Sequence, residues 1–101
     1  MPKYRISITE AAAQDLAKIV DYIASDNPDA ALKLAESIEQ GIIMLEDFPL
    51  TGTTPKDRRL TRQGYRILIV DSYLVFYVFL NNEIVEIRRI ISGKRDYKFL
   101  L

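Results

Sequence analysis

The side chains best suited to chemistry lie near the C-terminus, where a predicted strand ends in clustered positive charge. Residues 84–91 are rich in Ile and Val, which favours a strand. Gly93 interrupts this pattern, and Lys94, Arg95 and Tyr97 follow shortly after. A guanidinium group can bind a phosphate or a carboxylate through two parallel hydrogen bonds, and a Tyr ring can stack on a base. The segment therefore predicts a surface for a phosphate or an acidic partner, with a solvated tail as the alternative.

Arg89 is a further candidate for the same surface. In strict strand alternation its side chain would share a face with the apolar residues Val85, Ile87 and Ile91. Such a face is unfavourable for an unpaired charge. Two interpretations stay open: Arg89 belongs to the cationic surface, or it forms a structural ion pair. Carboxylates that could pair with it include Glu86, Asp71 and Asp96.

Three other groups of side chains have both a chemical and a structural interpretation. A basic cluster between two predicted elements could dock nucleic acid, but a charged loop is more often only solvated; it comprises Lys56, Arg58, Arg59 and Arg62. Three tyrosines could form a stacking platform, but packing within the sheet is favoured; they are Tyr65, Tyr73 and Tyr77. The acidic residues of the predicted helices are interpreted as a solvated face; they are Asp15, Asp21, Asp26, Glu36, Glu39 and Glu46.

Composition excludes several classes of function. The 101 residues contain no Cys and no His. A typical zinc site, a disulfide, and Cys–His or Ser–His catalysis are therefore excluded, and neither a metal nor a cofactor is predicted. The N-terminus lacks the apolar run of a signal peptide, and the run Leu74–Leu80 is too short to span a membrane. We expect one cytoplasmic domain over residues 1–101, with no membrane partner.

Charge is unevenly distributed, although the net charge is zero. Residues 1–55 carry four basic and nine acidic side chains, whereas residues 56–101 carry ten basic and five acidic ones. This polarity indicates an anionic partner for the C-terminal half, although surface charges also segregate by chance.

The N-terminal half predicts a strand followed by two helices. Residues 4–8 alternate between apolar and polar side chains, as a half-buried strand does. Thr9 and Asn27 are good N-caps, and each precedes a segment with apolar residues at helical spacing. Phe48-Pro49 ends the second segment. Because the link between the two helices is tight, they should form an antiparallel hairpin.

The C-terminal half predicts a polar connector and three strands. Residues 50–63 form the connector, which we expect to be the most mobile segment. Strands near residues 65–70, 73–80 and 84–91 form an antiparallel meander. The order β-α-α-β-β-β predicts an α+β domain with a helical hairpin on one face of a mainly antiparallel four-stranded sheet. The edge at which the first strand pairs stays open.

The middle strand of the meander is apolar on both faces, so it should lie centrally, with one face under the helices and the other partly covered. Residues 93–101 are expected to lie outside the core. The residues expected to join the hairpin to the sheet include Leu16, Ile19, Ile38, Ile42, Phe76 and Val78.

Short motifs follow one another along nearly the whole chain. They are Asp21-Tyr22-Ile23-Ala24, Asn27-Pro28, Ala30-Ala31, Leu45, Phe48-Pro49, Gly52, Tyr65-Arg66, Tyr73-Leu74-Val75-Phe76-Tyr77, Val85-Glu86-Ile87-Arg88-Arg89-Ile90 and Gly93-Lys94-Arg95-Asp96. No single motif is specific, but their order and spacing resemble the ParE/RelE superfamily of type II toxin–antitoxin toxins.

The resemblance implies a function. The helical part is similar to the ParE branch, whose described members poison DNA gyrase, whereas the RelE branch consists of ribosome-dependent mRNA endonucleases. It implies a toxin that arrests growth by binding an essential target, most consistently DNA gyrase. A cognate acidic antitoxin that folds on binding would neutralise it in a hetero-oligomer. Two alternatives stay open: mRNA cleavage on the ribosome, and a non-toxic, degenerate binding or regulatory module.

The catalytic residues of RelE-type toxins are only partly matched. Arg66 stands at one of two lysine positions of the second strand, and Arg95 at the C-terminal arginine. Leu68 and Leu74 stand where further cations are expected, and Tyr97 comes earlier than the late Tyr of that branch. The resemblance thus gives Arg66, Arg95 and Tyr97 as catalytic candidates, and it favours a binding protein over an enzyme. The candidates for binding the target or the antitoxin are Arg66, Arg89, Lys94, Arg95 and Tyr97.

Overall fold

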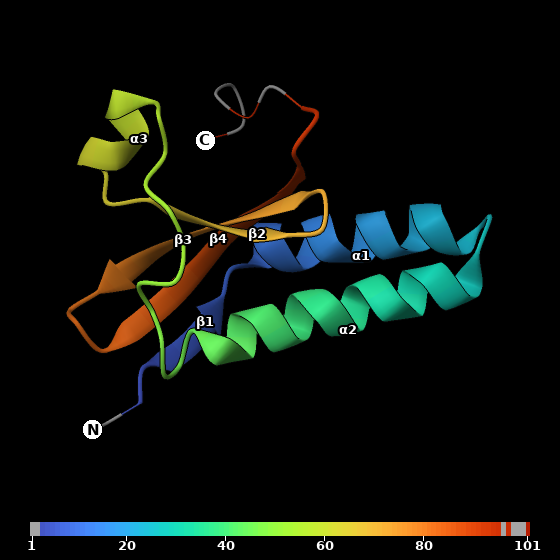
Figure 1. Cartoon of the computed structure of the whole chain (residues 1–101), viewed down its shortest axis with the longest axis horizontal. Helices are drawn as coiled ribbons and strands as arrows, with labels where there is room; N and C mark the ends of the chain where they lie inside the picture. The colour runs from blue at the N-terminus through green and yellow to red at the C-terminus, as the bar shows by residue number, and fades with distance from the viewer. Residues whose placement is uncertain (1–2, 96, 98–100) are drawn as a thin grey trace.

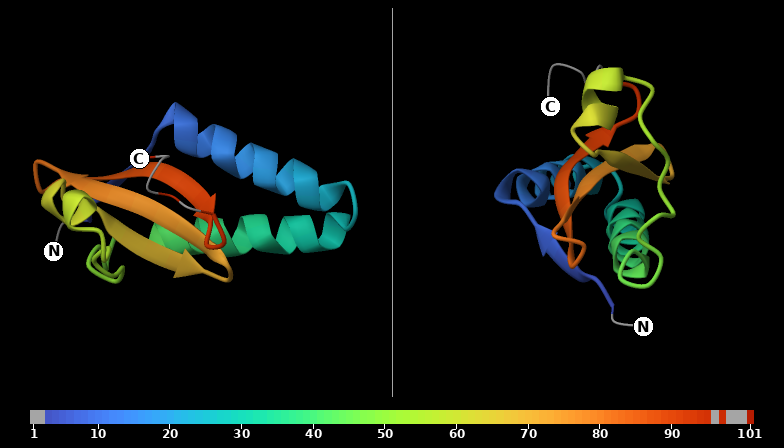
Figure 2. Two further views of the ribbon diagram at one scale, coloured as in Figure 1. Left: turned by 90° about the horizontal axis from the view of Figure 1, so that it is seen from above. Right: turned by 90° about the vertical axis from the view of Figure 1, so that its left-hand side faces the viewer.

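The computed structural model describes residues 3–95, 97 and 101, and it contains the predicted order of elements with one additional short helix (Figure 1). The two long helices run side by side against one side of the sheet, and the short helix lies on the other side (Figures 1 and 2). The α+β class and the helical hairpin are confirmed. The elements are β1 (Arg5–Ile8), α1 (Glu10–Ala24), α2 (Pro28–Met44), α3 (Arg58–Arg62), β2 (Arg66–Val70), β3 (Tyr73–Leu80) and β4 (Ile84–Ser92).

Both long helices begin where the sequence predicts. The side chain of Thr9 accepts a hydrogen bond from the N–H of Ala12 at 3.2 Å, and that of Asn27 accepts one from the N–H of Ala30 at 3.1 Å. These contacts satisfy N–H groups that have no partner within the helix. Pro28 occupies the first turn of α2, where its missing N–H removes no helical bond.

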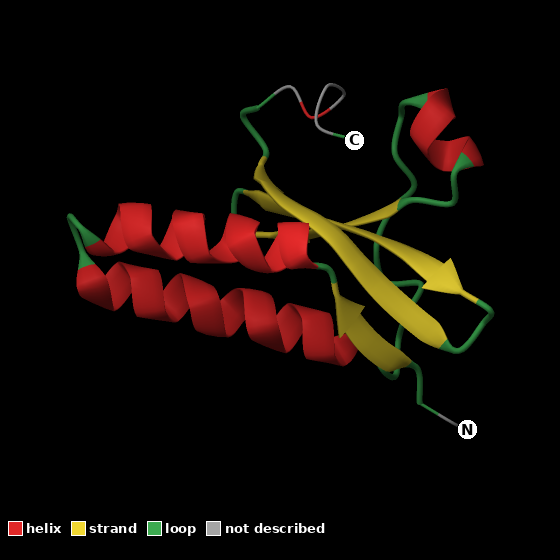
Figure 3. Ribbon diagram, turned by 180° about the vertical axis from the view of Figure 1, so that it is seen from behind, coloured by secondary structure: helices red, strands yellow, loops and turns green. Residues whose placement is uncertain are grey.

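The sheet has the strand order β1-β4-β3-β2, with β1 parallel to β4 and the other neighbours antiparallel (Figure 3). β1 therefore lies at the edge of the sheet next to β4, a pairing that could not be decided from the sequence. The two hairpin turns use Asp71, Asn81 and Asn82 at φ 53°, 54° and 57°. Asn and Asp tolerate this left-handed backbone better than other side chains do.

A β-bulge interrupts the pairing of β3 with β4. Phe76 pairs with Arg89 but the next residue, Tyr77, pairs with Ile87, so Arg88 is an extra residue in β4. Side chains beyond the bulge therefore depart from strict alternation, and Ile90 packs in the same core as Val85 and Ile87, while Ile91 packs on the other face. The predicted grouping of Arg89 with Ile91 on the face of Val85 and Ile87 is wrong for this reason.

Two apolar cores lie on opposite faces of the sheet. The core under the hairpin includes Ile38, Ile42, Leu45, Val75 and Tyr77. The second core includes Leu60, Tyr65, Ile67, Phe76, Val78 and Ile91. The expectation that Phe76 and Val78 join the hairpin to the sheet is therefore wrong, since Val75 and Tyr77 of the same strand do so. A strand that is apolar on both faces gives no sequence signal for which set faces the helices.

The segment expected to be a polar connector covers the second core. It contains α3, whose Leu60 is fully buried, and Thr53 forms an isolated bridge with Ile67. Tyr97 and Leu101 also pack against this core, so the expectation that residues 93–101 lie outside the core is wrong for both of them. No helix among the described residues is long and apolar enough to cross a bilayer.

Candidate functional site

Lys94 and Arg95 lie on a turn that is anchored to the sheet. The N–H of Gly93 donates to the carbonyl oxygen of Ser72 at 2.8 Å, and the N–H of Arg95 donates to that of Ser92 at 3.1 Å. Both cationic side chains are exposed. The turn thus presents two cations to solvent from a fixed position beside the β2–β3 turn.

Arg89 forms a bidentate ion pair with Asp15 of α1. Its Nε donates to Oδ2 at 2.7 Å and its Nη2 to Oδ1 at 2.9 Å, while the N–H of Ile90 donates to Oδ2 at 3.0 Å. The two side chains are 23% and 16% exposed. The hydrogen bond to Asp15 raises the pKa of Arg89, against the opposing effect of burial.

The position of this pair follows from the length of β1. The last residue of β1, Ile8, pairs with Ile87, and the backbone N–H of Thr9 still reaches the carbonyl oxygen of Ile87. Beyond this point α1 replaces β1 along the edge of β4, and Asp15 accepts the strand N–H that a longer β1 would have bonded. The carboxylate of Asp15 on α1 therefore takes the place of a backbone acceptor at the edge of β4.

The interpretation of Arg89 as a structural ion pair is confirmed, but its partner differs from those considered. Glu86 pairs instead with Arg88, at 2.5 Å. Asp96 lies outside the described residues. The interpretation of Asp15 as part of a solvated face is wrong, because its carboxylate is mostly buried against β4.

Arg66 attaches a loop to the sheet. Its Nη2 donates to the carbonyl oxygens of Leu50 at 3.1 Å and Gly52 at 2.5 Å. The hydroxyl of Tyr77 reinforces the same loop, since it donates to the carbonyl oxygen of Pro49 at 2.7 Å and accepts from the N–H of Gly52 at 3.0 Å. The guanidinium of Arg66 is thus bonded to backbone.

Tyr97 packs against the second core. Its ring centroid lies 5.0 Å from that of Phe76 at an interplanar angle of 49°. The ring contributes to burying Phe76, whose side chain is fully enclosed.

The three catalytic candidates are not gathered in one place. Arg66 stands opposite Tyr77 on β3, whereas Arg95 follows Ser92, which stands opposite Tyr73. At the rise of a strand, these two positions on β3 are roughly 13 Å apart. Arg66 and Tyr97 also lie on opposite faces of the sheet, because Tyr77 belongs to the core under the hairpin and Phe76 to the second core.

The remaining candidates have structural roles or lie elsewhere. Tyr77 is fully buried and Tyr65 packs edge-to-face on Phe76, which confirms packing for these rings. The basic cluster lies around α3, where a shallow depression of about 390 Å³ is lined by Lys56, Arg58 and Arg62, among others. No group of three metal-ligating side chains occurs in the described part of the chain.

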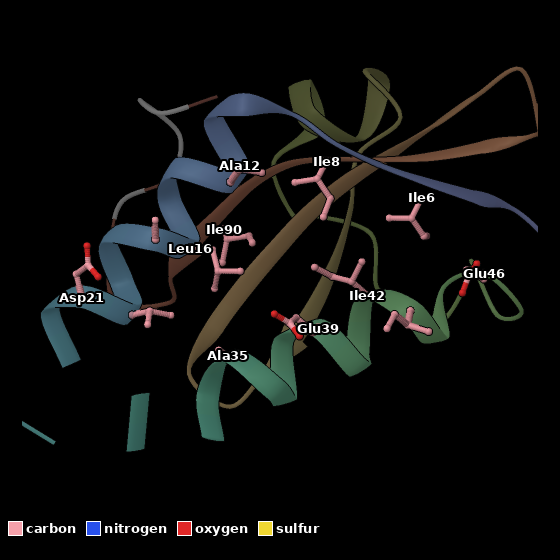
Figure 4. A pocket seen from close by; sticks show the side chains of 14 residues that line it. Ile6, Ile8, Ala12, Leu16, Asp21, Ala35, Glu39, Ile42, Glu46 and Ile90 are labelled. Atoms are coloured by element: carbon pink, nitrogen blue, oxygen red, sulfur yellow. The ribbon is translucent and has the colours of Figure 1, made fainter. Parts of the chain in front are cut away.

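An apolar groove that the sequence did not predict lies beside the helical hairpin. It lies between α1, α2 and β1 and has a volume of about 750 Å³ (Figure 4). Its walls include Ile6 and Ile8 of β1, and Ile8 is half exposed. Its charged lining residues are all acidic: Asp21, Glu39 and Glu46. The only sequence signal was that the apolar stripes of the helices include more residues than one sheet face can cover.

Comparison with solved structures shows in which other chains this fold occurs. The structure is similar to a chain of the chromosomal ParDE toxin–antitoxin system from P. aeruginosa, with a TM-score of 0.75, 21% identity, and coverage of 91% of this chain and 98% of that one. It is also similar to a chain of the RelBE2 toxin–antitoxin complex from Mycobacterium tuberculosis, with a TM-score of 0.62, 18% identity, and coverage of 89% and 98%. The fold is therefore shared with chains of a ParDE system and of a RelBE2 complex.

The sequence gives the family. Residues 6–97 match the family described as the ParE toxin of the type II toxin–antitoxin system parDE. A search of curated protein sequences finds no significant match. Because the family match spans most of the chain, the protein belongs to the ParE toxin family.

Proposed function

We propose that this toxin arrests growth by binding DNA gyrase rather than by cleaving RNA. The proposal is supported by two positions at which an RNA-cleaving relative needs free polar groups. In this protein both side chains support the fold instead. Arg66 is bonded to the carbonyl oxygens of Leu50 and Gly52, and Tyr97 packs on Phe76. Cleavage by proton transfer needs an acid and a base within reach of one ribose–phosphate unit, whereas Arg66 and Tyr97 lie on opposite faces of the sheet.

The experiment compares the two target classes directly. Purified toxin is added to a gyrase supercoiling reaction and, separately, to ribosomes programmed with a defined mRNA. We expect supercoiling to be inhibited and the mRNA to remain intact. Cleavage of the mRNA at a rate that falls in Arg95→Ala would overturn the proposal in favour of the endonuclease. Inactivity in both assays together with normal growth on expression would favour a non-toxic module.

We further propose that a cognate antitoxin neutralises the toxin by laying an amphipathic segment along the groove between α1, α2 and β1. Apolar side chains of that segment would cover the half-exposed wall, which includes Ile8 and Ile43. Because the charged rim of the groove is acidic, the part of the antitoxin that lies here should carry basic residues, even if the antitoxin is acidic as a whole.

A groove-filling variant tests this docking mode. Ala17 lines the groove and is exposed, so Ala17→Trp should obstruct it without disturbing the core. Ala11 is also an exposed residue of α1 but lies outside the groove, which makes Ala11→Trp the matched control. We expect the cognate antitoxin, co-expressed with the toxin, to co-purify with the wild type and with Ala11→Trp but not with Ala17→Trp. Equal recovery of the three complexes would refute the docking mode.

A further inference from the structure

A second cleft lies on the other flank of α1 from the apolar groove. It has a volume of about 480 Å³ and is bounded by the outer half of α1, by Tyr73 and by the end of β4 with its following turn. The hairpin extends beyond the end of the sheet, so the last turns of α1 are open on this side (Figure 2). The lining residues are Asp15, Lys18, Ile19, Tyr22, Tyr73, Ile90, Ile91, Ser92 and Arg95.

The charges of this cleft leave it positive. Among the described residues that line it, the one acidic residue is Asp15, which is held by Arg89 and by the N–H of Ile90. Lys18 and Arg95 have no ion pair with any carboxylate in the described part of the chain. Two cations on facing elements, one from a helix and one from the anchored turn, therefore border a shared hollow.

The floor and rim of the cleft are apolar and aromatic. Ile19, Ile90 and Ile91 line it, and Tyr22 at its edge is 82% exposed. An exposed Tyr combines a large apolar surface with a hydroxyl group and loses little conformational entropy on binding, which makes it common at the centre of protein interfaces.

We propose that this cleft binds an acidic peptide segment of a protein partner. A carboxylate of that segment would lie between Lys18 and Arg95, and an apolar neighbour would pack on Tyr22. The proposal rests on the charge and shape of the cleft, and it does not depend on which essential target the toxin attacks.

A peptide fits this cleft better than a nucleic acid does. Nucleic-acid binding without base contacts requires a run of cations that follows several phosphates. The described residues of the cleft include two cations, Lys18 and Arg95, and α1 presents Asp21 to the groove on its other side. The basic residues around α3 form a separate depression and do not extend the cleft.

The probes are two blocked pentapeptides, Leu-Glu-Leu-Glu-Leu and the matching peptide with Gln in place of Glu, together with a ten-residue oligothymidylate. Each is titrated into the full-length, isotope-labelled protein, and amide chemical shifts are followed. We expect the Glu peptide to shift the amides of Lys18, Tyr22 and Arg95, and the Gln peptide to bind about tenfold more weakly, since one lost charge-assisted contact is worth roughly that factor.

Variants of the two cations test whether the Glu peptide binds in this cleft. Lys18→Gln combined with Arg95→Gln should weaken binding of the Glu peptide about tenfold or more, whereas Lys33→Gln, which removes an exposed cation of α2, should leave it unchanged. Equal binding of the two peptides would overturn the proposal, as would full binding by the double variant. Tighter binding of the oligothymidylate at the same amides would assign the cleft to nucleic acid instead. Both positions of the double variant are exposed, so a dispersed spectrum verifies that it is folded.

Discussion

Asp15 is the residue whose removal tests the structure most directly. Its carboxylate accepts two hydrogen bonds from the guanidinium of Arg89 and one from the N–H of Ile90. In Asp15→Ala, Arg89 keeps its charge in a site where its side chain is only 23% exposed, and the N–H of Ile90 loses its acceptor. The substitution therefore affects the contact of α1 with β4 as well as an ion pair.

The expected loss of stability in Asp15→Ala depends on the three hydrogen bonds of its carboxylate and on how far they are exposed to water. Removing one member of a fully buried pair costs about 3–5 kcal/mol. Here both side chains keep some contact with water, which can partly replace Asp15, so we expect a loss of about 2–3 kcal/mol in the free energy of unfolding. Asp15→Asn keeps an oxygen for the N–H of Ile90 but loses the charge, and should cost about 1–2 kcal/mol.

Urea unfolding followed by circular dichroism measures these differences. Asp21→Ala removes an exposed carboxylate from the same helix and should change stability by no more than about 0.5 kcal/mol. A double-mutant cycle with Arg89→Ala should give a coupling energy of about 1 kcal/mol or more. A cost of less than about 1 kcal/mol for Asp15→Ala, or simple addition of its effect and that of Arg89→Ala, would show that the ion pair does not stabilise the fold.

Three further predictions concern packing, and urea unfolding measures each. Phe76→Ala should cost about 3–5 kcal/mol because the ring is fully buried; a loss below about 1 kcal/mol would contradict that burial. Tyr77→Phe should cost about 1–3 kcal/mol, since the N–H of Gly52 loses its acceptor; an unchanged midpoint would show that water replaces the hydroxyl. Tyr97→Ala should cost about 1–3 kcal/mol by uncovering Phe76, and no loss would mean that the C-terminal segment is dispensable for the fold.

Local signals in the sequence predicted the elements well. The caps Thr9 and Asn27, and the turn residues Asp71 and Asn81, each act through groups within a few residues of themselves. Such contacts can be inferred from residue type and spacing alone. The order of elements then limits the architecture to few alternatives, which is why the helical hairpin on a mainly antiparallel sheet was predicted.

Most of the errors concern contacts between residues that are distant in the sequence. Arg89 pairs with Asp15 across 74 positions, and nothing near either residue indicates the other. The bulge at Arg88 changes which side chains of β4 face the helices, and Leu60 gave too weak a signal for α3 within a polar segment. For the candidate site, the sequence correctly placed Lys94 and Arg95 on the surface, but it could not show that Arg66 and Tyr97 support the fold.

The two clefts together set a requirement for any single partner that occupies both. At 100° per residue, the residues of α1 that line the groove, such as Ala13 and Val20, lie nearly opposite those that line the second cleft, such as Asp15 and Tyr22. The groove has an acidic rim and the second cleft is positive. One chain that covers both flanks of α1 must therefore carry basic residues in the part that enters the groove and acidic residues in the part that enters the cleft. A partner of uniform charge would be attracted to one flank and repelled by the other, so the order of charges along the partner, rather than its net charge, decides whether it fits.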